Sequence, residues 1–207
     1  MSEKTMRISA VLLGAGESRR MGRDKLILPW GKRTVFEHCL DILLLSRVRE
    51  VIVVLGRRKK ALEPLVREQS SFSKRVKVVY NRAFRHGMSS SIRVGLRAMD
   101  PASEGVLIAL GDQPLLRTRT INALILGFCK GKGKIAVPFY QGKRGNPVLF
   151  GREYIGDLLG MRGDRGGRSI LETHPEDILR IRTRSEGVIR DIDTGREYRK
   201  LKIRTLR

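Results

Sequence analysis

The sequence predicts an α/β fold with three layers, in which helices cover both faces of a mostly parallel β-sheet. The main observation is an alternation along the chain: short apolar runs with the length of buried strands are followed by longer stretches with helical spacing of apolar residues. The second observation is composition, because 41% of the 207 residues are hydrophobic, which is enough for a real core. We therefore expect one domain over residues 1–207.

Four apolar runs in the first half of the chain are interpreted as buried strands, each followed by a helix. The strands are expected over residues 7–13, 51–55, 76–80 and 105–110, and the helices over residues 35–44, 61–69, 89–99 and 121–128. Thr34 and Glu37 have the spacing of a capping box at the start of the first helix. Ligands of such sheets bind beyond the carboxyl ends of the strands, so the residues that follow each strand are the first candidates for a site.

The sequence changes character after about Phe139, where glycine and arginine become more frequent and the expected elements become shorter. A further strand is expected over residues 135–137 and a returning strand over residues 188–192, with short elements between them over residues 147–150, 153–159 and 167–173. We interpret residues 139–187 as an insertion or lid region over the sheet edge and not as a separate domain.

The net charge of +22, from 43 Lys and Arg against 21 Asp and Glu, raises the local concentration of anions. Nucleic acid is the first such partner to consider. The basic residues are spread along the whole chain, however, and only 5% of the residues are aromatic, which argues against a base-stacking surface. We therefore expect polyanionic small molecules as partners, and not nucleic acid.

Membrane insertion and zinc chemistry are not expected. No apolar run approaches the roughly 20 residues that cross a bilayer. The apolar run over residues 8–13 is too short for the core of a signal peptide and has no small-residue cleavage site after it. The two cysteines and three histidines are too scattered for a zinc site. We expect a cytoplasmic protein with no membrane partner.

A glycine-rich, basic loop follows the first expected strand, from Leu13 to Lys25. Gly14 and Gly16 let the backbone approach a ligand closely and point N–H groups at it. Arg20 and Lys25 add positive charge where phosphates would lie. The loop therefore indicates a site for a nucleoside triphosphate, although a tight strand-to-helix turn would also explain its first glycines.

Two commoner phosphate-binding loops are excluded. The string GxxxxGK[ST] of a P-loop does not occur in the chain. A dinucleotide-binding fingerprint needs a third glycine at the position of Arg19.

Carboxylates follow two other expected strands. Asp112 stands at the carboxyl end of the fourth strand, and Mg²⁺ prefers one or two carboxylates together with phosphate oxygens and water. Strand alternation places Asp191 and Asp193 on the same side of the last expected strand. Asp112 is thus a candidate ligand for Mg²⁺. A turn cap for Asp112 and a chance acidic pair on a solvated strand are the competing interpretations.

Three glycine-bounded segments complete the candidate set. Residues 87–91, Gly-Met-Ser-Ser-Ser, resemble a helix start with hydroxyl groups available for capping. Residues 142–147 and 163–168 are basic, and the second precedes an expected helix whose positive end could hold a phosphate. Simple capping for the first segment and surface turns for the other two remain open alternatives.

The string GAGESRRMGRDKLILPWG, residues 14–31, resembles the signature of the MobA-like nucleotidyltransferases, which is roughly GxSxRMGxxK followed by a short apolar run and Pro. Within that group the chain is similar to the CTP:molybdenum cofactor cytidylyltransferases. Their GMSSSLR, LxGDxP, DIDTPED, GRRGHPV and GDRGAR stretches resemble segments 87–93, 110–115, 191–197, 142–148 and 163–168, respectively. Residues 195–197 and Asn146 depart from the family pattern, which has Pro-Glu-Asp and His there.

The resemblance implies a Rossmann-like, three-layer α/β/α nucleotidyltransferase of the nucleotide-diphospho-sugar transferase type, with Mg²⁺ as its cofactor. It implies catalytic roles for Arg20, Lys25 and Asp112, and metal binding by Asp112 and Asp193. The implied nucleotide-binding residues are Leu13, Gly14, Ala15, Gly16, Arg20, Lys25, Asn81, Met88, Ser89, Ser90, Gly111 and Asp112. The implied acceptor-binding residues are Arg144, Asn146, Asp164 and Arg165, which places the region 139–187 on the acceptor side.

The activity implied by the resemblance is transfer of CMP from CTP to the phosphate of molybdenum-bound molybdopterin, with release of pyrophosphate. GTP-using relatives have a GPLAG-like stretch where this chain has Gly-Met-Ser-Ser-Ser, which favours CTP. An apo-molybdoenzyme is a further expected partner, as recipient of the product. The alternatives are a guanylyltransferase, another NTP:phosphate nucleotidyltransferase, and a molybdopterin-binding chaperone without catalysis.

Overall fold

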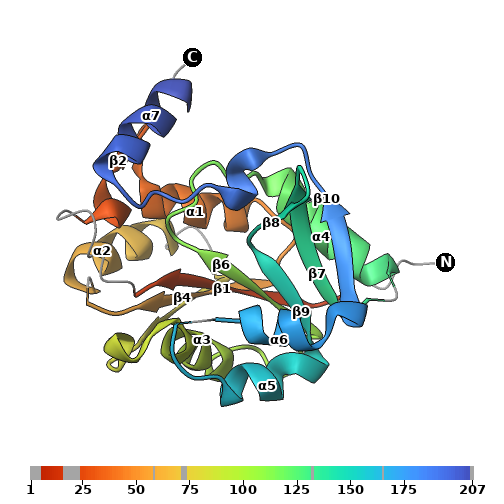
Figure 1. Ribbon diagram of the computed structural model, residues 1–207. Helices are drawn as coiled ribbons and strands as arrows, with labels where there is room; N and C mark the ends of the chain where they lie inside the picture. Colours follow the sequence, from red (N-terminus) through yellow and green to blue (C-terminus); the bar gives the residue numbers. More distant parts are fainter. Residues whose placement is uncertain are drawn as a thin grey trace.

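An eight-stranded mixed sheet forms the centre of the molecule in the computed structural model, which describes residues 6–15, 24–57, 59–70, 74–131, 133–164 and 166–205 (Figure 1). The strand order is β10-β7-β9-β6-β1-β4-β5, with β8 paired to β7. The strands are β1 (Ile8–Gly14), β4 (Glu50–Leu55), β5 (Val76–Tyr80), β6 (Gly105–Leu110), β7 (Ile135–Tyr140), β8 (Lys143–Arg144), β9 (Val148–Gly151) and β10 (Ile178–Arg182). The central pairs β6–β1, β1–β4 and β4–β5 are parallel, as predicted.

Helices cover both faces of this sheet, so the three-layer prediction is confirmed (Figure 1). One face carries α1 (Val35–Leu44), α2 (Lys59–Ser70) and α4 (Thr118–Lys130), and the other carries α3 (Met88–Arg97), α5 (Ile155–Gly160) and α6 (Arg168–Thr173). The remaining elements are the hairpin strands β2 (Pro29–Trp30) and β3 (Arg33–Thr34), the helix α7 (Gly195–Thr205), and 3-10 helices over Lys25–Ile27, Phe84–His86, Arg152–Tyr154, Pro175–Asp177 and Glu186–Ile189.

Two hydrophobic clusters fill the space between the layers, because successive strand residues point to opposite faces. Leu12 of β1 packs with Phe36 and Leu40 of α1, whereas its neighbour Val11 packs with Ile92 of α3 on the other face. This explains why the central strands are continuous apolar runs.

The capping box predicted for α1 is present. The hydroxyl of Thr34 accepts a hydrogen bond from the backbone N–H of Glu37 at 3.3 Å, and Glu37 Oε2 accepts one from the backbone N–H of Thr34 at 2.8 Å. These bonds satisfy backbone groups that a helix start otherwise leaves free.

The expected place of residues 139–187 over the sheet edge is wrong in part. Strand β9 lies inside the sheet, antiparallel to both of its neighbours β6 and β7. Strand β10, which the sequence analysis missed, forms the edge beside β7. Apolar and exposed basic residues alternate in this strand: Leu179 and Ile181 are partly buried, and Arg180 and Arg182 are exposed. This period-2 pattern is the signal in the sequence that indicates a strand.

The prediction of a strand over residues 188–192 is also wrong. Residues Glu186–Ile189 form a 3-10 helix, and the following segment is held by a hydrogen bond from the backbone N–H of Ile192 to the carbonyl of Asp112 at 3.0 Å. A short apolar run does not distinguish a strand from a single helical turn, which accounts for the error.

Helix α7 projects from the body and carries the C-terminus (Figure 1). Its base is docked on β2, where Tyr198 Oη donates a hydrogen bond to the carbonyl of Pro29 at 2.6 Å and Leu201 packs in a cluster with Trp30. Among the residues that the structure describes, no helix combines the length and apolar character that a membrane span requires.

Candidate functional site

The loops after β1 and β6 lie side by side at the carboxyl edge of the sheet. Leu13 and Leu110 are partners in the parallel register, and the backbone N–H of Gly111 donates to the carbonyl of Leu13 at 3.1 Å. The predicted residues Gly14, Ala15, Gly111 and Asp112 are therefore brought to one place, as expected for the ends of adjacent parallel strands.

Lys25 lies between two carboxylates at this edge. Its Nζ is 2.6 Å from Asp112 Oδ2 and 3.1 Å from Asp193 Oδ1. The side chains of Lys25, Asp112 and Asp193 are only 15%, 18% and 26% exposed. Three segments that are distant in the sequence thus converge, and each had been singled out from the sequence.

The charge state of Lys25 follows from this arrangement. Burial lowers the pKa of its ammonium group, but the charges and hydrogen bonds of Asp112 and Asp193 outweigh burial, so the pKa is raised above its usual value. Lys25 is therefore a permanently positive group between two carboxylates.

Asp112 has the features of a metal ligand. Its Oδ2 pairs with Lys25, while its buried Oδ1 accepts no hydrogen bond from any described residue. A buried carboxylate oxygen without a partner is costly unless a cation or water approaches it. No group of three or more His, Cys, Asp and Glu side chains in the described part of the chain is placed to hold a metal. Two carboxylates suffice for Mg²⁺, which keeps several waters and phosphate oxygens as its other ligands.

A third carboxylate, Asp191, lies in the electrostatic field of the same cluster. Its pKa is raised, first by burial and then by the negative charges of Asp112 and Asp193, against a hydrogen bond at 3.4 Å from Gln113 Nε2. The resemblance implies a metal-binding role for Asp193 and none for its neighbour Asp191. The site therefore has three carboxylates close enough to influence one another, one more than the two predicted as metal ligands.

Gly14 and Gly111 have a packing reason to be glycine. A Cβ on Gly14 would lie 2.6 Å from the ring of Phe36, and a Cβ on Gly111 would lie 2.5 Å from the same ring. From the sequence, Gly14 is expected for the close approach of a ligand or for a tight turn, and this packing contact is a further reason. Gly16 and Arg20, which carried the rest of that prediction, lie outside the described residues.

Asn81 holds the start of α3 in place. Its Nδ2 donates to Ser90 Oγ at 2.8 Å and to Ser91 Oγ at 2.9 Å, and its Oδ1 accepts from the backbone N–H of Ala83 at 2.9 Å. Asn81 was expected to bind the nucleotide, whereas its amide is engaged here by protein groups. Its place after β5 still positions the 87–91 segment beside the carboxyl edge.

The serines of the 87–91 segment point into the protein. Ser89 and Ser90 are buried, and Ser90 Oγ donates to the carbonyls of Gly87 at 2.8 Å and Ala83 at 3.0 Å. These hydroxyl groups therefore do not cap the free N–H groups of α3. Met88, which is exposed, is the side chain of this segment that is open to a ligand.

The cap of α3 comes from a distant segment. Asp164 Oδ1 accepts a hydrogen bond from the backbone N–H of Met88 at 2.9 Å, and the carbonyl of Gly163 accepts one from Ser89 at 3.1 Å. Gly87 has a φ of 87°, and a Cβ there would lie 2.5 Å from Asp164 Oδ1. Asp164, expected at the acceptor, is thus a helix cap in this structure, and Arg165 lies outside the described residues.

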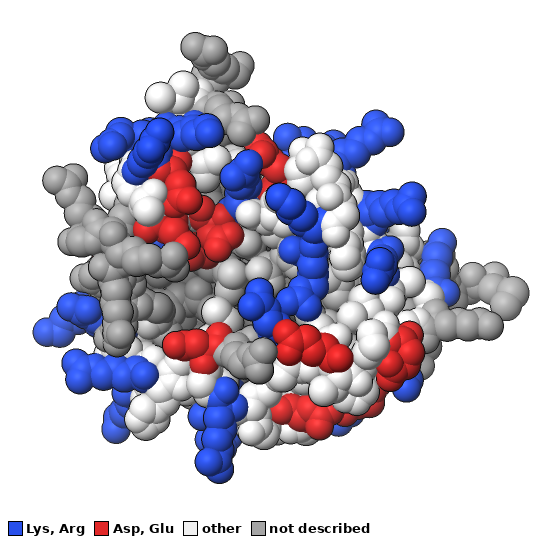
Figure 2. All heavy atoms as spheres, in the orientation of Figure 1, with Lys and Arg blue, Asp and Glu red and all other residues white. Residues whose placement is uncertain are grey.

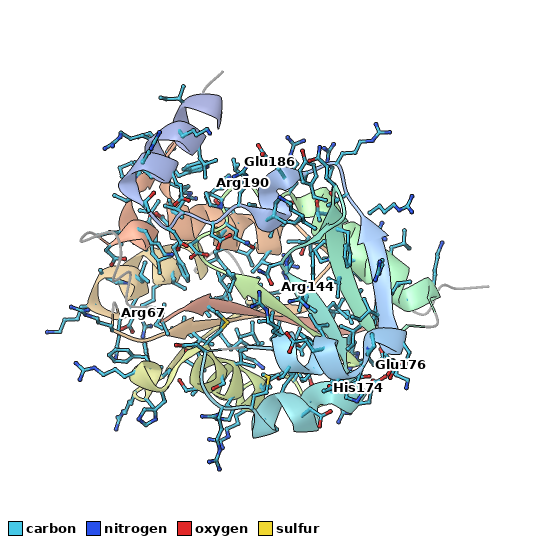
Figure 3. All side chains as sticks on the ribbon, in the orientation of Figure 1. Arg67, Arg144, His174, Glu176, Glu186 and Arg190 are labelled. Atoms are coloured by element: carbon cyan, nitrogen blue, oxygen red, sulfur yellow. The ribbon has the colours of Figure 1, made fainter. Side chains whose placement is uncertain are left out.

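Charged side chains of both signs lie on the face of the molecule seen in Figure 2. Figure 2 shows acidic side chains gathered below α7 and Lys and Arg side chains nearer the centre of the view. Arg144, exposed at the end of β8, lies near the middle of the view in Figure 3. The neighbouring Asn146 is fixed through its backbone N–H, which donates to the carbonyl of Val188 at 2.8 Å.

Comparison with known proteins identifies the class. The model of the MobA-like NTP transferase domain matches residues 10–178. The chain therefore belongs to the MobA-like NTP transferase family, a family of nucleotidyltransferases. The resemblance to the MobA-like nucleotidyltransferases seen in the sequence is confirmed at the level of the family.

Curated relatives carry several names. The purine catabolism protein PucB of Bacillus subtilis (strain 168) is 30% identical over 192 residues, covering 91% of this chain and 92% of PucB. The nicotine blue oxidoreductase of Paenarthrobacter nicotinovorans is 28% identical over 211 residues, covering 94% of this chain and 96% of the oxidoreductase. The molybdenum cofactor cytidylyltransferase of Escherichia coli (strain K12) is 24% identical over 191 residues, covering 92% and 93%. The cytidylyltransferase is thus less similar than the other two.

Solved structures share the whole fold. The crystal structure of Rv0371c from Mycobacterium tuberculosis H37Rv has a TM-score of 0.80 and 26% identity, covering 97% of this chain and 100% of that one. A structure of the same protein in complex with manganese has a TM-score of 0.73, and the match covers 96% of this chain and 99% of that one. A nucleotidyl transferase of Methanothermobacter, Mth528, has a TM-score of 0.78 at 26% identity.

Proposed function

We propose that the protein transfers CMP from CTP to the phosphate of a molybdopterin-type acceptor and releases pyrophosphate. An acceptor phosphate oxygen forms a bond to the α-phosphorus of CTP, and the bond between that phosphorus and the oxygen that joins it to the β-phosphorus breaks. This oxygen leaves with pyrophosphate. The observation that carries the proposal is the position of Lys25 between Asp112 and Asp193 at the carboxyl edge. No nucleophilic side chain is required, because the attacking phosphate is already charged and catalysis is alignment and charge stabilisation.

Asp112 and Asp193 would hold Mg²⁺, which supplies positive charge to the phosphate oxygens when bound. The free, buried Oδ1 of Asp112, within the described part of the chain, supports this role. The manganese in the Rv0371c structure supports a divalent metal in a relative with the same fold. Lys25, positive at all physiological pH values, would stabilise the charge on the departing pyrophosphate.

The glycine-rich loop would hold the triphosphate. Leu13, Gly14 and Ala15 end β1 beside Gly111, and Phe36 fills the space beneath the two glycines, so the backbone is supported where phosphates would lie. Gly16 and Arg20 would bind the triphosphate as well, an assignment that rests on the sequence alone.

The segment after β5 would contact the base and ribose. Met88 is the exposed member of the segment, while Asn81, Ser89 and Ser90 support it from below through the contacts described above. A role in base choice follows from the similarity of residues 87–93 to the GMSSSLR stretch of the cytidylyltransferases.

The second substrate would lie over residues 139–187, the acceptor side of the single domain. Arg144 is exposed there, and Asn146 is held beside it. Asp164 would act by fixing its own segment, which precedes Arg165 in the sequence, to the start of α3. An apo-molybdoenzyme is the proposed recipient of the product in the cytoplasm.

A pyrophosphate-release assay tests this proposal. The purified chain is incubated with Mg²⁺, molybdenum-bound molybdopterin and each of CTP, GTP, ATP and UTP in turn, and the nucleotide product is identified by mass. We expect release with CTP at a rate at least about tenfold above GTP, since one lost base contact corresponds to roughly 1.4 kcal/mol or more. The Asp112→Asn variant serves as the inactive control and Asp157→Asn, an exposed residue of α5, as the matched active one.

Three outcomes would contradict the proposal. Faster release with GTP would make the protein a guanylyltransferase, and release that depends on another phosphate acceptor would replace molybdopterin. No release with any nucleotide, combined with tight binding of molybdopterin, would favour a chaperone without catalysis.

A further inference from the structure

A second charged site lies at the opposite edge of the sheet. A cavity of about 440 Å³ opens at the amino ends of β1, β4 and β5. Its lining consists of Met6, Arg7, Arg47, Val48, Arg49 and Arg75. Because β1 spans 7 residues, roughly 20 Å of sheet separates this arginine cavity from Lys25 and Asp112. The proposed transfer reaction gives the cavity no role.

Arg75 forms a fixed wall of the arginine cavity. Its Nη1 donates to the carbonyl of Val48 at 3.0 Å, and its Nη2 donates to the carbonyl of Leu44 at the end of α1. A guanidinium at the C-terminal end of a helix satisfies carbonyls that have no partner within the helix. Arg75 is therefore held in place in the wall of the cavity and adds positive charge to it.

The other three arginines have their backbones fixed and their guanidinium groups available. The backbone N–H of Arg47 donates to Asn122 Oδ1 at 2.9 Å, and that of Arg49 donates to the carbonyl of Ile8 at 2.7 Å. Within the described residues, the exposed guanidinium groups of Arg7, Arg47 and Arg49 form no hydrogen bond or ion pair.

Neighbouring carboxylates do not neutralise these arginines. Glu50, next in the chain to Arg49, pairs with Lys77 at 2.7 Å and accepts a hydrogen bond from Ser9 Oγ at 2.6 Å. Glu104, at the rim, accepts a hydrogen bond at 3.0 Å from the backbone N–H of Arg7 and not from its side chain. The positive charges of Arg7, Arg47 and Arg49 are thus gathered in a concave place, and none of their guanidinium groups has a carboxylate partner among the residues that the structure describes.

We propose that the arginine cavity binds a small anion with two or more linked phosphate groups. Guanidinium groups match phosphate oxygens in pairs, and several of them together favour a multiply charged ligand. The volume is that of a small-molecule site. The described residues of the lining include no aromatic side chain on which a base could stack, so the site recognises the phosphate chain itself.

The test is calorimetric titration of the full chain with inorganic tripolyphosphate, without divalent metal, at about 0.15 M salt, where weak surface attraction is screened. The cavity variant is Arg47→Ser together with Arg49→Ser. The matched control is Arg199→Ser together with Lys200→Ser, which removes the same charge from exposed positions of α7. Lys25→Ala separates binding at the arginine cavity from binding at the candidate transfer site.

We expect the cavity variant to lose at least about tenfold in tripolyphosphate affinity, because two charge-assisted contacts disappear. The control and Lys25→Ala should keep the wild-type affinity at this site within about twofold, and the cavity variant should keep wild-type turnover. Equal affinity of the cavity variant and the wild type would overturn the proposal. An equal loss in the α7 control, or cavity-dependent binding of short RNA without binding of tripolyphosphate, would overturn it as well.

Discussion

The ring of Phe36 lies directly beneath Gly111, so close that a Cβ on the glycine would be 2.5 Å from the ring. The same ring closes off Gly14, which brings the two loops of the candidate site onto one buried side chain. Through Phe36, helix α1 thereby limits how closely the backbones of both loops can approach it.

The first prediction concerns this contact. Gly111→Ala is expected to destabilise the protein by about 1–3 kcal/mol, the usual cost of overpacking. In a Phe36→Leu background the same substitution should cost less by at least about 0.5 kcal/mol, because the obstructing ring is gone. Urea unfolding of the four proteins measures both quantities. Identical costs in the two backgrounds would show that Phe36 is not the obstruction.

The second prediction concerns Asp112. Asp112→Asn should reduce turnover by roughly 10²–10³-fold, since it removes a charge from the reacting phosphates and their metal. Binding of Mn²⁺, followed by electron paramagnetic resonance, should weaken in parallel. Asp157→Asn is the control and should change neither quantity. Unchanged Mn²⁺ affinity of Asp112→Asn would remove Asp112 from the metal site.

The third prediction separates Lys25 from the metal ligands. Lys25→Ala should also lower turnover by roughly 10²–10³-fold. Its affinity for Mn²⁺, in contrast, should stay equal or rise, because a positive charge is removed from beside Asp112 and Asp193. A loss of Mn²⁺ affinity in Lys25→Ala would mean that the lysine acts by holding the carboxylates in place.

The fourth prediction concerns pH and Glu50. Burial raises the pKa of this carboxyl group, but hydrogen bonds from Lys77, Ser9 and the backbone of Asp100 outweigh burial and lower it below its usual 4.5. A carboxylate with a lowered pKa contributes stability that is present above pH 4.5 and is lost as the pH falls through the folded-state pKa.

Unfolding free energy should therefore fall more steeply below pH 4.5 in the wild type than in Glu50→Gln. Urea titrations between pH 3 and pH 7, a range of roughly two units around the carboxyl pKa, measure the difference. Parallel curves for the two proteins would show that Glu50 has no linkage to folding.

The fifth prediction concerns the cap of α3. Asp164→Ala should cost about 1 kcal/mol of unfolding free energy, the typical loss for a helix cap. It should also raise amide hydrogen exchange at Met88 and Ser89, whose N–H groups bond to residues 163 and 164. Asp157→Ala is the control. Unchanged exchange at Met88 would contradict the capping role.

Much of the fold could be predicted because its signals are local. The strands β4 and β6 contain long apolar runs, and β5 is mostly apolar apart from Lys77. The capping box at Thr34 defines the start of α1 within its own sequence. The convergence of Lys25, Asp112 and Asp193 was also foreseen in part, because motifs that follow parallel strands end at one edge.

The remaining features depend on contacts between distant residues. Nothing in the local sequence of Asn81 shows that Ser90 and Ser91 will engage its amide, and nothing near Asp164 shows that Met88 will use its carboxylate. The place of β9 between β6 and β7 is likewise set by tertiary packing, since Val148–Gly151 is only 4 residues long. Periodicity carries little information over so short a run.

The position of β9 has a consequence for synthesis of the chain. Strand β6 emerges from the ribosome well before β9, its permanent neighbour on one side, so its edge stays unpaired until residue 151 has been made. An unpaired edge invites pairing with another chain. A ribosome that stalls between β6 and β9 therefore releases a product with an open, apolar sheet edge, and such a fragment should aggregate where the finished protein does not.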